Sequence, residues 1–369
     1  MRIKSLILVL LVFFTEITAQ EYIFEAQNIT TDDGLLNLMT HTISGSQQGF
    51  LWIGTQYGLN KYDGHTFQQY TVEKNNLFTN AHIHKIEEDE AGNLWLFHYY
   101  SLKKDTFVSG IDIFNPTSQQ AIPFNEFFES KMPFDPSEMT MLTINDPKKR
   151  IWLTNKKGQI FLYQNKGLKK IIEKKGVIFT TLTVDQEDNI WLSYDRELLR
   201  IDTLGRILES LQLPDLINDV WVGEKNKLWV VTSKGQSLDK RVSIWSKSNQ
   251  NSDFQKLTLS KNESTSIQAE QAIRASNGLW YVMVKGRFEL FDATGKWIFD
   301  FNSLLGKNMQ TGFTDYFETK DHIWFTTPLG IIKTSVKINP FQLIHSRENL
   351  SDCRDITEDQ NGNIYFLNG

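Results

Sequence analysis

The sequence predicts an all-β fold, a seven-bladed β-propeller of four-stranded antiparallel blades followed by the first strands of a second propeller. Three observations carry this prediction: a tryptophan-centred motif that recurs, a constant order of strands and turns around it, and a chain end that repeats the chain beginning. The motif, an Ile or Leu followed by Trp and another apolar residue, recurs at Trp52, Trp95, Trp152, Trp191, Trp229, Trp280 and Trp324, and a last version has Tyr365. Periods of about 40–45 residues are typical of propeller blades.

Each repeat unit contains the same series of elements. A partly alternating run is followed by a turn rich in Asp, Gly and Asn, such as "QEDN", and then by the Trp strand and two further apolar strands. Short turns between such runs indicate a four-stranded antiparallel meander. The Trp strand is apolar at consecutive positions, as at residues 51–53, which favours a strand covered on both faces by neighbouring blades. We therefore expect the tryptophans to pack between blades and not to bind ligand.

The order of the units also predicts how the ring closes. A strand-like segment, "YIFEAQNIT" at residues 22–30, stands before the first complete unit. We expect it to form the outer strand of the seventh blade, next to "GIIKTSV", because this pairing joins the two ends and covers an exposed edge. The alternative is that residues 341–344 close that blade and leave the N-terminal strand spare. The predicted domains are a signal peptide (1–19), the propeller (20–340) and a truncated second propeller (341–369).

The chain beginning predicts export. Residues 1–19 combine Arg2 and Lys4, an apolar run at residues 6–14, and Ala19 at a plausible cleavage point, the pattern of a secretory signal peptide. The alternative, an uncleaved anchor helix, needs a longer apolar run. We expect a periplasmic protein that has no intrachain disulfide, because Cys353 is the only cysteine.

The composition excludes some classes of function. The 369 residues are 40% hydrophobic, enough for a sizeable core, and the formal net charge is -5. A mildly acidic chain without a basic stripe argues against binding to nucleic acid. No GxSxG, P-loop, HExxH or CxxC pattern occurs, so we expect no cofactor and no catalytic residue.

The first unit resembles a known repeat family. The segment "TTDDGLLNLMTHTISGSQQGFLWIGTQYGLNKYDGHTFQQY", residues 30–70, is similar to the two-component regulator propeller repeat. The resemblance implies a periplasmic sensor region of a hybrid two-component system of the Bacteroidetes type, in which two propellers precede a β-sandwich, a membrane helix and a histidine kinase. It also implies that the ligand is an oligosaccharide or another small molecule and that the partner is the remainder of a sensor kinase. This chain departs from the pattern, because it stops after the first propeller without a kinase motif.

Candidate ligand-binding residues lie in the loops between the second and third strands of the units. Aromatic faces can stack on sugar rings, and cations can fix an acidic group. The candidates are Gln56 and Tyr57 in the first unit, Tyr99, Tyr100, Lys103 and Lys104 in an enlarged loop of the second, Tyr194, Asp195 and Arg196 in the fourth, and Lys285 and Arg287 in the sixth. These residues can equally be ordinary solvated loop residues. A long polar insertion at residues 233–254 is expected to be a surface loop.

Three histidines are candidates for a metal site in a sequence that has no catalytic motif. His82 and His84 are placed on one face of a strand, and His41 has a similar place in the preceding unit. Two imidazoles on one strand face can bind a metal ion, but the spacing suggests no third ligand, so we expect polar residues near the propeller opening and no metal. The "DDG" at residues 32–34 is likewise expected to be a turn and not a cation site.

Three functions remain open at this level. The first is a non-catalytic, ligand-sensing input domain of a two-component system. The second is a lyase-type propeller enzyme with its site at the ring opening, which a cluster of histidines and acids at the central mouth would favour. The third is a protein-interaction or homodimerisation platform, which a large exposed apolar patch would favour.

Overall fold

The computed structural model describes residues 22–72, 78–103, 106–128, 133–143, 146, 148, 150–164, 167–234, 241–248, 252–262, 265–306, 312–338, 353–358 and 364–368. The chain divides into two compact units, of which the larger is Glu25–Ser335 and the smaller combines the two chain ends. The predicted signal peptide lies outside the described residues. None of the described helices is long and apolar enough to cross a membrane.

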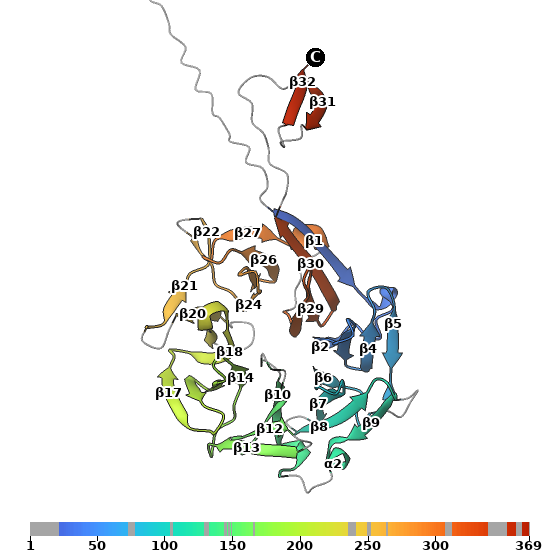
Figure 1. Cartoon of the computed structure of the whole chain (residues 1–369), viewed down its shortest axis with the longest axis vertical. Coiled ribbons are helices and arrows are strands. Elements are labelled where there is room, and N and C mark those ends of the chain that lie inside the picture. Colours follow the sequence, from blue (N-terminus) through green and yellow to red (C-terminus); the bar gives the residue numbers. More distant parts are fainter. Residues whose placement is uncertain are drawn as a thin grey trace, which may run out of the picture. The chain divides into compact units, whose positions relative to one another are not determined.

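Seven four-stranded antiparallel sheets surround a common centre in the larger unit (Figure 1). Blade 1 is β2 (Thr40–Gly45), β3 (Leu51–Thr55), β4 (Gly58–Tyr62) and β5 (Phe67–Tyr70). Blade 2 is β6 (Ile83–Glu88), β7 (Leu94–Lys103), β8 (Thr106–Asn115) and β9 (Gln120–Pro123). Blade 3 is β10 (Met139–Thr143), β11 (Trp152–Asn155), β12 (Gln159–Gln164) and β13 (Gly167–Glu173).

The remaining blades continue around the ring. Blade 4 is β14 (Thr181–Val184), β15 (Ile190–Tyr194), β16 (Glu197–Ile201) and β17 (Ile207–Gln212). Blade 5 is β18 (Leu216–Val222), β19 (Leu228–Lys234), β20 (Arg241–Lys247) and β21 (Gln255–Leu257). Blade 6 is β24 (Gln271–Arg274), β25 (Trp280–Val284), β26 (Arg287–Phe291) and β27 (Trp297–Asp300). Blade 7 is β28 (Asp315–Glu318), β29 (Ile323–Thr327), β30 (Gly330–Ile338) and β1 (Tyr22–Ile29).

Short elements connect the blades. A two-stranded sheet, β22 (Ser260–Asn262) and β23 (Thr265–Ser266), follows blade 5, and the single-turn helices α2 (Phe124–Phe127) and α3 (Asn302–Leu305) follow blades 2 and 6. The predicted turn at "DDG" is a 3-10 helix, Thr31–Asp33, capped by Thr30 and ended by a left-handed Gly34. These connections leave the seven-blade repeat intact.

The recurring tryptophans lie in the second strand of every blade, as predicted, and each is at most 6% exposed. In blades 2, 3 and 4 the indole Nε1 donates to an aspartate six residues earlier, for example from Trp95 to Asp89 Oδ2 at 3.1 Å. The same carboxylate accepts from the backbone N of Ala91 and Asn93, so one aspartate fixes both the turn and the indole. Blades 1, 6 and 7 lack that aspartate, and their indole Nε1 atoms have no hydrogen-bond partner among the described residues.

The N-terminal strand closes the ring. The seventh sheet has the order β1-β30-β29-β28, which confirms the predicted pairing of residues 22–30 with the strand that begins at Gly330 (Figure 1). Gly330 has a φ of +108°, and a Cβ there would lie 2.4 Å from the carbonyl oxygen of Ile29. The alternative closing segment, residues 341–344, lies outside the described residues.

Two predicted loops are wrong because strands extend into them. The enlarged loop of the second unit is a long β-hairpin, in which β7 and β8 pair from Leu94↔Phe114 to Lys103↔Thr106. The polar insertion of the fifth unit contains β20, whose Ile244 is 2% exposed. Single apolar residues in a polar run, such as Ile244 and Trp245, provide enough buried surface for an inner strand of a repeat.

The chain end contains a hairpin. Strands β31 (Cys353–Glu358) and β32 (Ile364–Asn368) pair with each other in an antiparallel two-stranded sheet. This pair does not by itself show the start of a second propeller, which stays a prediction.

The closure is tested by two substitutions on β1. Ile29 is 2% exposed in a core cluster with Ile43 and Trp324, whereas Ile23 is 38% exposed. We expect Ile29→Ala to lower the free energy of unfolding by about 2–5 kcal/mol, as for other buried Ile and Leu truncations, and Ile23→Ala to change it little. Urea unfolding followed by tryptophan fluorescence measures both. Equal effects of the two substitutions would contradict the pairing.

Candidate functional site: the central channel

The first strands of blades 1, 2, 3, 4, 5 and 7 line a cavity of about 850 Å³ at the centre of the ring. Because each blade presents its first strand to the axis, residues far apart in the sequence meet here. The lining combines apolar side chains with polar and charged ones. Its charges are unequal: among the described lining residues, five carboxylates face one ammonium group, those of Glu87, Glu88, Asp219, Asp315 and Glu318 against Lys85. The channel is therefore a region of negative potential.

Beta-bulges determine which side chains reach the channel. Four of the first strands have a register shift at the same place, between Thr40 and Thr42 in β2, Ile83 and Lys85 in β6, Met139 and Met141 in β10, and Ile217 and Asp219 in β18. The extra residues at these bulges are His41, His84, Thr140 and Asn218, and all four line the channel. A bulge re-aims a side chain, and bulges are frequent next to functional sites.

An ion pair crosses the inner wall of the ring. Lys85 Nζ of β6 lies 3.1 Å from Asp315 Oδ2 of β28, so it joins blade 2 to blade 7 past blade 1. Thr42 Oγ1 of β2 donates to the same carboxylate oxygen at 2.7 Å, and Glu87 lies 3.8 Å from the ammonium group. Burial lowers the pKa of Lys85, but Asp315 and Glu87 outweigh burial and raise it above its ordinary value. Lys85 is thus a fixed positive charge in this wall.

Asp219 is a channel carboxylate with a raised pKa. Partial removal from water raises the pKa of Asp219 to about 6. The negative charge of Asp315 adds to this rise, and the positive charge of Lys85 opposes it. The Asp219 side chain is nevertheless exposed to the channel, and water there limits the rise. Burial also raises the pKa of Tyr316, and the carboxylates of Asp219 and Asp315 raise it further. Among the five carboxylates of the described lining, Asp219 is the exposed one.

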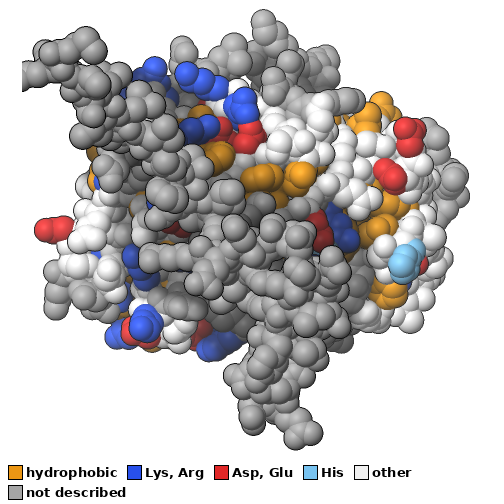
Figure 2. All heavy atoms as spheres, turned by 90° about the horizontal axis from the view of Figure 1, so that it is seen from above, with side chains coloured by type: hydrophobic (Ala, Val, Ile, Leu, Met, Phe, Trp, Pro, Cys, Tyr) orange, Lys and Arg blue, Asp and Glu red, His pale blue; other side chains and the backbone are white. Residues whose placement is uncertain are grey.

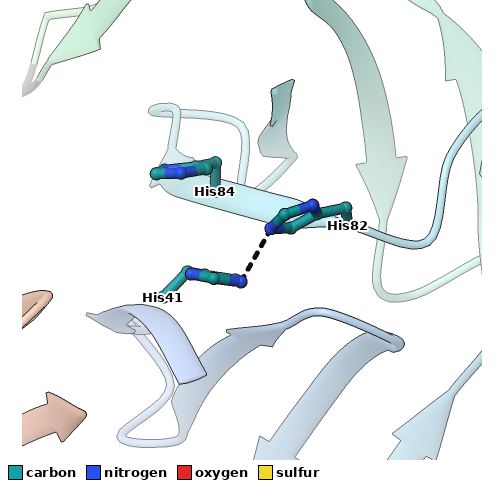
Figure 3. Close-up of side chains that lie close together, drawn as sticks. All are labelled: His41, His82 and His84. Carbon is teal, nitrogen blue, oxygen red and sulfur yellow. Dashed lines mark hydrogen bonds between the residues drawn. The ribbon is translucent and has the colours of Figure 1, made fainter. Parts of the chain in front are cut away.

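Three imidazoles lie close together (Figure 3), and two of them, those of His41 and His84, line the channel. His41 comes from β2, His82 from the residue before β6 and His84 from the bulge of β6, and one ring nitrogen of each lies within 4.8 Å of the others. The Nε2 atoms of His41 and His82 are 2.7 Å apart. Burial, and then the other two imidazoles, lower the pKa of His41 to about 4. Burial is also the first cause that lowers the pKa of His82 and of His84, so this cluster is uncharged at neutral pH.

A buried polar network positions His82. His98 Nδ1 lies 3.3 Å from the carbonyl oxygen of His82, and His98 Nε2 lies 2.9 Å from Asp112 Oδ2. Thr79 donates to the same carboxylate through its backbone N at 2.7 Å and its hydroxyl at 3.0 Å. His98 and Asp112 are 0% and 1% exposed. The connection that carries His82 is thus fixed from inside blade 2.

The predicted loop residues lie in or next to the turns between second and third strands. Tyr57 is 58% exposed in the β3–β4 turn, beside Gln56. Tyr194 is buried and its hydroxyl contacts Glu197, while Asp195 has a positive φ in the turn that it forms with Arg196.

The other predicted residues make local contacts or fall on undescribed atoms. Arg287 pairs with Asp300 of its own blade, and Lys285 N donates to Glu270. Lys104 lies outside the described residues, as do the side chains of Tyr99, Tyr100 and Lys103. The contacts of the described candidates are to residues of their own or an adjacent blade and do not bring the candidates of different blades together.

The sequence pointed to all three histidines but predicted no third ligand for the pair at residues 82 and 84. His41 joins that pair because blades 1 and 2 pack side by side. A signal was present: His41 and His84 differ by 43 positions, the same offset as Trp52 and Trp95. They therefore occupy the same place in consecutive repeats.

Comparisons with known proteins show the fold. No protein-family model matches the sequence, and no curated protein matches it. The virginiamycin B lyase of Staphylococcus aureus has a similar structure, with a TM-score of 0.59, 12% identity, and a match that covers 88% of this chain and 100% of the lyase. The C-terminal WD40 domain of Sif2 matches with a TM-score of 0.50 and 16% identity, over 88% of this chain and 91% of that domain. At such identity the likeness shows a propeller and nothing finer.

A lower structural similarity is found to a bacterial extracellular domain. An extracellular domain assigned to a hybrid two-component system of B. thetaiotaomicron matches over 94% of this chain and 64% of its own length, with 14% identity. The TM-score is 0.36, too low to carry an argument. The similarity of residues 30–70 to the two-component regulator repeat stays a resemblance of sequence.

Asp219 gives a pH-dependent prediction. Because its pKa is raised in the folded state, the stability it contributes is present at low pH and is lost as the pH rises through about 6. We expect Asp219→Asn to raise the melting temperature relative to wild type, with a larger gain at pH 8 than at pH 4.5. Asp321→Asn, at an exposed position outside the channel lining, is the control. A gain that does not change with pH would refute the assignment.

Proposed function

We propose that this chain is a non-catalytic, ligand-sensing propeller, the periplasmic input domain of a hybrid two-component system, and that it takes a neutral oligosaccharide into its central channel. The observation that carries the proposal is the cavity of about 850 Å³ lined by six blades. Its volume falls within the range of about 300–1,000 Å³ for sites of small molecules. A ligand there would contact strands from most of the ring at once.

The charge of the channel favours a neutral ligand that donates hydrogen bonds. Five carboxylates against one lysine repel an acidic group, and Asp219 offers an exposed acceptor. Sugar hydroxyls donate to carboxylates and also accept from groups such as the Lys85 ammonium. The phosphate or carboxylate ligands that a basic pocket would take are disfavoured here. A neutral glycan fragment therefore fits this wall better than an acidic one.

The coupling to a kinase is supported by the sequence resemblance of the first repeat. A ligand that bridges several first strands stabilises the ring by mass action, and the remainder of a sensor kinase would respond to that change through contacts with the propeller.

A homodimer is a further proposed assembly, since exposed apolar residues gather in blade 4, where Leu204, Ile207 and Leu208 are 67%, 54% and 47% exposed. On the face drawn in Figure 2, Lys and Arg side chains are interspersed with Asp and Glu.

A thermal-shift screen with neutral and acidic oligosaccharides tests the channel as the binding site. A neutral glycan at 100 times its dissociation constant should stabilise the fold by about 2.7 kcal/mol. Asp219→Ala should abolish the shift, and Tyr57→Ala, in the exposed β3–β4 turn, should leave it intact. Calorimetric titration of the same variants gives the dissociation constants. Loss of binding in Tyr57→Ala with retention in Asp219→Ala would place the site at the turns and refute the channel.

The second candidate, a lyase-type enzyme, is favoured by one observation. The uncharged imidazole of His41 lines the channel together with the carboxylate of Asp315, and the imidazole of His82 lies beside it, with the two Nε2 atoms 2.7 Å apart. A neutral imidazole within reach of a substrate proton is a general base. An enzyme with a similar fold is the virginiamycin B lyase of Staphylococcus aureus, which was solved with quinupristin in a catalytically inactive form, so quinupristin is the compound to try.

Incubation with quinupristin followed by mass spectrometry separates the two candidates. A lyase opens the lactone without change of mass, whereas hydrolysis adds one water. If the chain is a lyase, His82→Ala should abolish turnover and the exposed His65→Ala should not. If the chain is a non-catalytic sensor, the lactone should stay closed with every variant, and turnover that depends on His82 would overturn that function.

A further inference from the structure

We propose that His41, His82 and His84 form a binding site for a divalent transition-metal ion of the zinc class at the mouth of the channel. Two of these residues, His41 and His84, also line the channel, but metal binding there does not depend on a glycan. It uses side chains of two consecutive blades, so it exists only in the folded ring. The argument has three steps: geometry, positioning and choice of metal.

The geometry is close to that of a three-histidine metal site. Zinc binds imidazole nitrogen at about 2.0–2.1 Å with tetrahedral angles, which puts pairs of ligand nitrogens about 3.4 Å apart. In this structure the nearest pair, Nε2 of His41 and His82, is 2.7 Å apart, and the ligand atoms of all three histidines lie within 4.8 Å of one another. Small side-chain rotations therefore bring the three nitrogens onto one ion.

The backbone already holds the three residues in place. His41 and His84 sit at equivalent β-bulges, and Thr40, next to His41, donates to Thr327 O at 2.8 Å across the blade 7–blade 1 boundary. His82 is fixed by its contact with buried His98. These contacts fix the backbone from which the imidazoles project. His41 and His82 are half-buried, and His84 is exposed.

The donor set and the charge select the kind of ion. Three neutral imidazoles suit zinc, nickel, cobalt or copper, whereas magnesium and calcium need oxygen ligands. The carboxylates of the channel lining add negative potential that attracts a cation. Three protein ligands leave a fourth position for water or another ligand, the arrangement of open zinc sites. The ion would thus lie where a channel ligand enters.

Calorimetric titration of the tag-free chain, freed of metal with a chelator, tests the proposal. We expect one Zn²⁺ ion per chain, and no binding of Mg²⁺ under the same conditions. Since loss of an outer-shell partner alone costs 10–100-fold in affinity, removing one imidazole should cost about 100-fold or more. His41→Ala, His82→Ala and His84→Ala should each show this loss, and His65→Ala, an exposed histidine outside the cluster, should bind as wild type does.

A second measurement guards against variants that fail to fold. His84 is the most exposed of the three, so His84→Ala should keep the wild-type circular dichroism spectrum and melting temperature without metal, yet lose the rise in melting temperature that Zn²⁺ gives the wild type. Co²⁺ bound to the wild type should show the visible absorption of a tetrahedral site. Absence of stoichiometric binding, retention of binding in all three variants, or an equal loss in His65→Ala would overturn the proposal.

Discussion

The pairing of β1 with β30 is the interaction on which the rest of the structure depends. A four-stranded blade has two faces, and it becomes stable only when neighbouring blades cover both of them. The seventh blade lacks an outer strand of its own until Tyr22–Ile29 adds one. Across the same boundary, Thr40 Oγ1 donates to Thr327 O and Gly330 N donates to Leu38 O. These contacts hold blade 1 against blade 7 and so give the channel a continuous wall.

The wall then determines the chemistry at the centre. Strand β6 alone supplies His84 at the mouth, Lys85 in the ion pair with Asp315, and Glu87 beside the ammonium group. Blade 2 also contains the buried His98–Asp112 pair behind His82. Burying a polar pair of this kind is seldom the most stabilising choice for a core. Here the pair fixes the position of the short connection that carries His82, at some cost in packing energy.

The repeat could be predicted from the sequence, but the contacts between repeats could not. Consecutive apolar residues such as Leu51 and Trp52 show that a strand is covered on both sides, and the segment at residues 22–30 has no unit of its own, so the ring and its closure could be predicted. Bulges are invisible to such patterns, because a shift of one residue at His41 or His84 leaves the composition unchanged. The histidines could be named from the sequence, but their convergence and the charged lining of the channel could not be predicted. The turns are rich in aromatic and charged residues, yet the described candidate residues in different turns do not come together.

The closure by β1 has a consequence for folding kinetics. The first strand of the propeller to leave the ribosome must wait for β30, about 300 residues later in the chain, before it finds its partner. Pairing at such sequence separation is slow, because the entropy of a long loop is lost before the contact forms. Blades 1 to 6 can assemble from local hairpins in the meantime. The last step of folding is thus the docking of the two ends, and an unpaired β30 edge is the species most exposed to association with other chains until then.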